Sequence, residues 1–96
     1  MPIDLSDAAL DELKQWLAIT TARDDALLLR LVEAAHDLCI RFTGLEEIGW
    51  QDLPQPLRHG IIRHAAHQYR ERDAGPAETP PAAVAALWRP YRRIRL

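Results

Sequence analysis

The apolar residues of this chain repeat with helical spacing in four stretches, and prolines or glycines separate most of these stretches from one another. The clearest stretch is a broad stripe with a period of 3.6 residues. Its members are Leu28, Leu31, Val32, Ala35, Leu38, Cys39 and Phe42. No stretch alternates with the period of two that a half-buried strand would show. The spacing therefore predicts an all-α fold, a small bundle of about four helices.

The predicted bounds of these helices are 7–19, 24–43, 56–72 and 82–88. Ser6 is a typical N-cap for the first helix, and Asp24 or Asp25 is a typical N-cap for the second. Gly44 suits the C′ position after the second helix, because glycine adopts the left-handed conformation at little cost. Pro56 suits the first turn of the third helix, where a missing N–H leaves no hydrogen bond unmade.

The chain is long enough for one domain with a modest core, since 96 residues bury only about 60–65% of the surface that the unfolded chain exposes. We expect a helical core over residues 1–88 and an extended C-terminal tail over residues 89–96. A short irregular segment, Leu45–Pro56, separates the second helix from the third, and Trp50 within it is expected to be exposed. Pro90 is expected to stop the fourth helix.

The predicted tail keeps Tyr91, Ile94 and Leu96 among its arginines. It is too short to bury these side chains itself, so we expect it to become ordered on a partner, its arginines pairing with carboxylates.

The net charge of −2 hides an uneven distribution. Residues 1–52 hold eleven acidic and four basic side chains, whereas residues 53–96 hold three acidic and eight basic ones. The basic half could bind nucleic acid, with Arg58, Arg63 and Arg70 on the third helix, or it could be a solvated surface. A third interpretation is electrostatic contact between the acidic half of one copy and the basic half of the next.

Enzyme chemistry has little support in the sequence. Cys39 is the one cysteine and falls on the apolar stripe, which predicts a buried, unreactive thiol. His64 and His67 are spaced so that they could bind one metal ion, but further ligands are lacking, and histidines at an interface or surface are expected instead. We expect no catalytic residues, no metal and no cofactor.

No apolar run approaches the roughly 20 residues that a membrane span needs, and the N-terminus lacks the pattern of a secretory signal. A cytosolic protein without membrane contact is expected.

An ordered set of short segments gives the chain a resemblance to a known family. The segments are Leu10–Leu17, Asp24–Asp25, Leu31–Ala35, Phe42–Gly44, Leu53–Arg58, His67–Arg72, Pro80–Val84 and Leu87–Arg92. In this order they resemble the head–tail connector (adaptor) proteins of tailed bacteriophages, with an opening "LxELKxxL" helix and a terminal "LLxPYR". The segment after Gly44 is shorter here than is usual in that family.

The resemblance implies a structural protein that forms a ring, dodecameric in the particle, beneath the portal protein. Such a ring extends the DNA channel toward a tail or stopper protein, so DNA only passes through its lumen. The protein would lie at the head–tail junction of the virion, and in the host cytoplasm during assembly. The alternative function is a small helical DNA-binding or regulatory protein that uses the basic half.

Two sets of interaction residues follow from these expectations. The resemblance assigns portal binding to the C-terminal segment, namely Trp88, Arg89, Tyr91, Arg92, Arg93, Ile94, Arg95 and Leu96. Contacts between subunits are expected on charged faces and loops, at Asp24, Asp25, Arg30, Trp50, Arg58, Arg63 and Arg70.

Overall fold

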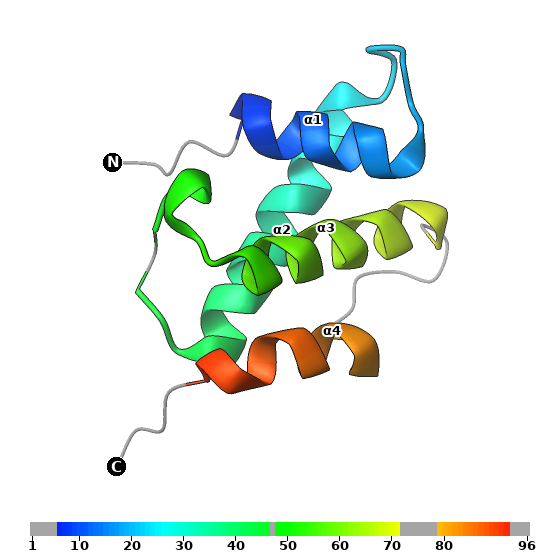
Figure 1. Cartoon of the computed structure of the whole chain (residues 1–96). Coiled ribbons are helices and arrows are strands. Elements are labelled where there is room, and N and C mark those ends of the chain that lie inside the picture. The colour runs from blue at the N-terminus through cyan, green and yellow to red at the C-terminus, as the bar shows by residue number, and fades with distance from the viewer. Residues whose placement is uncertain (1–5, 47, 72–78, 93–96) are drawn as a thin grey trace.

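The computed structural model describes residues 6–46, 48–71 and 79–92. These residues form four α-helices, two short 3-10 turns and no strand, which confirms the all-α prediction (Figure 1). In chain order the elements are α1 (Ser6–Leu17), α2 (Asp25–Thr43), η1 (Trp50–Asp52), α3 (Gln55–Arg70), α4 (Ala82–Trp88) and η3 (Arg89–Tyr91).

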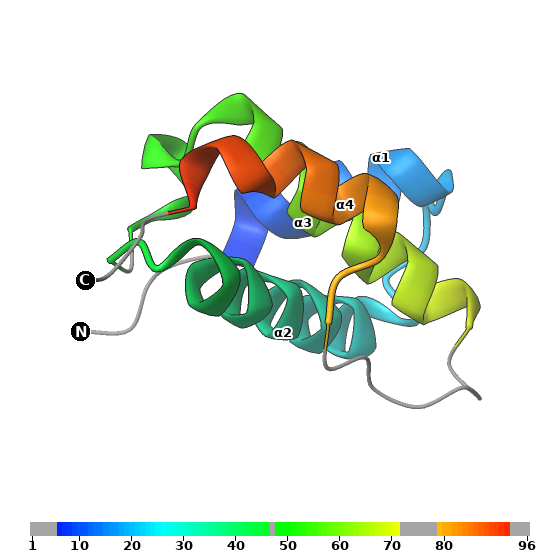
Figure 2. The same cartoon turned by 90° about the horizontal axis from the view of Figure 1, so that it is seen from below.

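The helices form two layers. Helix α2, the longest, makes one layer, and α1, α3 and α4 make the other, with α3 between α1 and α4 (Figures 1 and 2). The predicted stripe of α2 faces this second layer: Leu28, Val32 and Cys39 have no exposed surface. Leu13 of α1 and Ile61 of α3 are equally buried, so the core lies where α2 crosses α1 and α3.

The ends of the first two helices follow from local backbone chemistry. Gly44 ends α2 as predicted, with a φ of 74° and its N–H donating to the carbonyl of Ile40 at 2.8 Å. Helix α1 ends two residues earlier than predicted, because Ala18 adopts a positive φ of 59°. The N–H of Ile19 then donates to the Lys14 carbonyl at 2.9 Å, which is the hydrogen bond of a Schellman turn.

Asp24 and Asp25 connect helices instead of capping α2 with their side chains. Asp24 occupies the N-cap position, but its carboxylate makes no capping hydrogen bond. It accepts a 2.6 Å hydrogen bond from the hydroxyl of Tyr69 on α3. Asp25 forms an ion pair with Lys14 of α1, at 2.8 Å. The predicted side-chain cap is therefore wrong, and both carboxylates have partners within the chain.

Trp50 is the clearest correction in the irregular segment. It was expected to be exposed, but its side chain is only 2% exposed, and the indole N–H donates to the Glu12 carboxylate at 3.2 Å. The segment between α2 and α3 thus packs against the core through the indole ring of Trp50. Since that ring is covered by its own chain, the predicted inter-subunit role of Trp50 loses its physical basis.

Candidate functional site

Helix α4 packs against α3 through a tryptophan and a glycine. Trp88 has no exposed surface, and its indole N–H donates to the Leu57 carbonyl at 3.3 Å. Its ring lies directly over Gly60, where an added Cβ atom would come within 2.9 Å of ring carbons Cδ1 and Cε2. The ring can therefore pack this closely only because residue 60 has no side chain.

The beginning of the predicted tail is attached to this core. Arg89–Tyr91 form a 3-10 turn directly after α4, so this part of the tail is not extended as expected. Tyr91 is half-buried against the core. The Arg92 guanidinium lies 5.2 Å from the centre of the Phe42 ring, a cation–π distance, and that ring packs 6.0 Å from Trp88.

The predicted portal-binding segment therefore divides into three parts. Trp88 is a core residue with no surface to offer a partner, which corrects its assignment. Arg89 and Arg92 are exposed, and Tyr91 is half-buried. Residues 93–96, with the remaining predicted contacts, lie outside the described residues.

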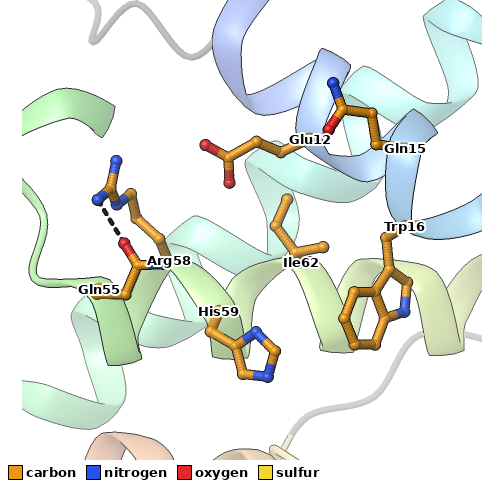
Figure 3. Close-up of a pocket in the computed structure, with 7 residues that line it drawn as sticks. All are labelled: Glu12, Gln15, Trp16, Gln55, Arg58, His59 and Ile62. Carbon is orange, nitrogen blue, oxygen red and sulfur yellow. Dashed lines mark hydrogen bonds between the residues drawn. The ribbon is translucent and has the colours of Figure 1, made fainter.

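A second candidate surface is an open cleft of about 320 Å³ between α1 and α3 (Figure 3). Its lining residues are Glu12, Gln15, Trp16, Gln55, Arg58, His59 and Ile62. Trp16 is 46% exposed and is the one large apolar side chain of the described residues that is exposed. Its ring meets His59 edge-on, with 5.4 Å between ring centres. The cleft thus has an apolar floor and wall within a charged rim.

The charges of the cleft are held by hydrogen bonds to neighbouring groups. Arg58 donates to the Gln55 side chain at 2.7 Å, while its Nε is buried without a hydrogen-bond partner. Glu12, on the opposite wall, accepts the hydrogen bond from Trp50. Arg58 on α3 and Glu12 on α1 therefore lie on opposite sides of the cleft, and each makes a hydrogen bond within the chain.

Of the predicted inter-subunit residues, only Arg58 lines this cleft. Arg63 lies five residues after Arg58 on α3 and is half-buried, Arg70 is exposed near the end of α3, and Arg30 is exposed on α2. The sequence pattern did not indicate Glu12 or Trp16 as interaction residues. The available signal was the position of Trp16 at the edge of the apolar stripe of α1, where a ring is only partly covered.

The nucleophilic and titratable groups of the core do not form a site. Burial raises the pKa of the Cys39 thiol to about 12, so it stays protonated, as the prediction of an unreactive thiol requires. His36 and His64 are buried, contrary to the prediction of interface or surface histidines. Burial, followed by the nearby His67, lowers the pKa of His64. Among the described residues, no three His, Cys, Asp or Glu side chains lie close enough to hold a metal ion.

None of the helices in the described part of the chain is long and apolar enough to cross a membrane.

No curated protein and no solved structure matches the chain significantly. The family model of the phage gp6-like head-tail connector protein matches residues 7–79. This range includes α1, α2, α3 and both walls of the cleft, and it ends before α4 and the tail. The chain belongs to the phage gp6-like head-tail connector family.

Proposed function

We propose that this protein is a structural subunit of a phage head–tail connector, assembling as a ring beneath the portal protein and extending the DNA channel toward the tail. The family match over residues 7–79 carries this proposal. The proposed ring is dodecameric in the particle, with a tail or stopper protein on its other side. The proposed location is the head–tail junction of the virion, reached from the host cytoplasm during assembly.

The role is structural, without catalysis or a cofactor. The chemistry of the described residues is consistent with this role, since the thiol of Cys39 is buried and protonated at neutral pH. The two most buried histidines, His36 and His64, lie within the helical core, where a substrate would not reach them.

The C-terminal segment is the proposed portal contact, now confined to Arg89 and to residues 91–96. Its first part is attached to the core by the contact of Arg92 with Phe42 and by the half-buried Tyr91. Anchoring a short segment at one end reduces the conformational entropy that it loses on binding. Arg93 and Arg95 would then pair with carboxylates of the portal, and Ile94 and Leu96 would fill apolar pockets.

Capture of the portal protein tests this proposal. Wild-type protein should retain the portal on a column, and a variant lacking residues 93–96 should lose it while keeping its helical circular dichroism. Arg95→Ser should weaken capture about tenfold, whereas Arg23→Ser removes one exposed arginine elsewhere and should not. Equal capture by the shortened variant would contradict the assignment of the tail.

DNA binding is less well supported by the position of the arginines. Arg58 and Arg63 are five residues apart on α3, which turns their side chains by about 140° relative to each other. Arg58 also donates to Gln55 within the same helix. A recognition helix would present its basic side chains on one face. A gel shift with short duplex DNA should therefore show weak binding or none, and tight binding that depends on salt would favour the alternative.

A further inference from the structure

The outer face of α2 carries a second surface that the fold does not use. Its exposed residues recur at helical spacing on the side away from the core: Ala26, Arg30, Glu33, Ala34, Asp37 and Arg41. Glu33 and Asp37 form a pair of carboxylates one turn apart, with the small side chain of Ala34 beside them. Arg30 and Arg41 flank this acidic pair. We define these six residues as the α2 outer face.

The α2 outer face and the cleft between α1 and α3 are complementary in charge. The cleft carries the guanidinium of Arg58 on its α3 side and the carboxylate of Glu12 on its α1 side. The α2 outer face carries charges opposite to these, because Glu33 and Asp37 lie one turn apart and Arg30 and Arg41 flank them. Trp16 offers an exposed ring within the cleft, and Ala34 is small enough to let a helix approach it.

We infer that the cleft between α1 and α3 binds the α2 outer face of a second copy of this chain. This inference rests on the proposed ring and specifies which surfaces form it. The acidic pair of Glu33 and Asp37 meets Arg58, Ala34 packs against Trp16, and a flanking arginine of α2 approaches Glu12. The contact covers the exposed tryptophan and pairs charges that the isolated chain leaves facing solvent.

The placement of the two surfaces explains why such a contact continues from copy to copy. They belong to different layers of the molecule (Figure 2), and the cleft residues come only from α1 and α3 (Figure 3). Each copy can therefore offer its cleft to one neighbour and its α2 outer face to another. A head-to-tail contact of this kind closes into a ring when its rotation is a whole fraction of a turn.

Two variants, each altering one surface, test this contact. Glu33→Arg/Asp37→Arg reverses the α2 outer face and leaves the cleft intact. Trp16→Glu places a carboxylate in the cleft and leaves α2 intact. Self-association is measured by sedimentation velocity and native mass spectrometry at low ionic strength. Each variant alone should bind itself at least roughly thirtyfold more weakly than wild type, because one loses an aromatic anchor and the other meets like charges.

An equimolar mixture of the two variants gives the decisive result. It contains one intact pair of surfaces, so it should form a 1:1 heterodimer that grows no further. Loss of association in both variants without a heterodimer would overturn the head-to-tail contact. Arg58→Glu repeats the cleft test with a half-buried side chain in case Trp16→Glu unfolds, and circular dichroism checks both.

The controls separate failure of this contact from failure of the ring. Glu46→Arg/Asp52→Arg changes two exposed carboxylates outside both surfaces and should associate like wild type. Wild-type association that Trp16→Glu and Arg58→Glu leave unchanged would overturn the proposed surfaces while the ring stands. A wild-type chain that stays monomeric at high concentration and low salt would overturn both the contact and self-assembly, whereas portal capture would still test the connector function.

Discussion

Helix α3 has α4 on one flank and α1 on the other, and each of these neighbours contacts it through a tryptophan. The two contacts differ in how far the tryptophan is buried. On the α4 flank, Trp88 is fully buried and donates its N–H to a backbone carbonyl. On the α1 flank, Trp16 remains 46% exposed beside an open cleft. Gly60 makes the close packing of Trp88 possible, because it lets the ring approach the helix backbone. The closed flank stabilises the chain's own fold, and the open flank keeps apolar surface for a partner.

The largest expected effect is on the closed flank. Trp88→Ala should reduce the free energy of unfolding by about 3–5 kcal/mol, because a fully buried indole is removed and the hydrogen bond to Leu57 is lost. Urea denaturation followed by circular dichroism measures this change. A loss below about 1 kcal/mol would mean that α4 contributes little to the core and that the two flanks do not differ.

The second prediction concerns the close approach that the closed flank needs. Gly60→Ala should cost a net 1–2 kcal/mol or so, because the new methyl group displaces the ring of Trp88 by more than alanine's better helix propensity restores.

The matched control for this prediction is the same change made in a Trp88→Ala background. There, Gly60→Ala should be neutral or stabilising, since the ring that it would meet is gone. Both variants are measured by urea denaturation, as a double-mutant cycle. A similar cost in both backgrounds would show that Gly60 matters for another reason than room for the ring.

The local spacing of apolar residues predicted the helices well. The burial of individual side chains was predicted less well, because it depends on contacts between residues far apart in the sequence. The stripe of α2 and the glycine that ends it depend on neighbours within one or two turns, so the sequence specifies them. The burial of Trp50 depends on Glu12, 38 residues away. That of Trp88 depends on Leu57, 31 residues away. Spacing alone gives no sign of either partner.

The same limit applies to the candidate site. Arg58 was predicted as an interaction residue because it is one of several arginines in the basic half. The cleft that it lines exists only because α1 lies beside α3, which brings Trp16 and Glu12 opposite it. Asp24 is another example. Its residue type is typical of a helix cap, but its carboxylate accepts a hydrogen bond from Tyr69 of α3 instead.

The third prediction concerns His64, a buried side chain of α3, and the dependence of the stability of the fold on pH. The pKa of His64 is lowered in the folded state, so the unfolded chain takes up a proton first as the pH falls below its ordinary value of about 6.5. The stability that neutral His64 provides is therefore present above that pH and is lost as the pH falls toward the lowered pKa. The loss is at most about 1.4 kcal/mol per pH unit for one proton.

Urea denaturation between pH 7.5 and 5 measures this dependence. His64→Gln should be less stable at neutral pH if the ring packs well, but its stability should fall less steeply with decreasing pH than that of wild type. A variant whose stability falls as steeply as that of the wild type would show that other groups cause the acid sensitivity.

The smallest effect on stability is expected on the open flank. Trp16→Ala should cost less than about 1 kcal/mol, since nearly half of the ring already contacts solvent and its edge-on contact with His59 is weak. Compared with Trp88→Ala, the same substitution then separates folding from association: one flank loses stability, and the other loses binding to a second copy. If Trp16→Ala destabilised the fold as much as Trp88→Ala does, the α1 flank would be part of the core, and its exposed ring would no longer argue for a partner.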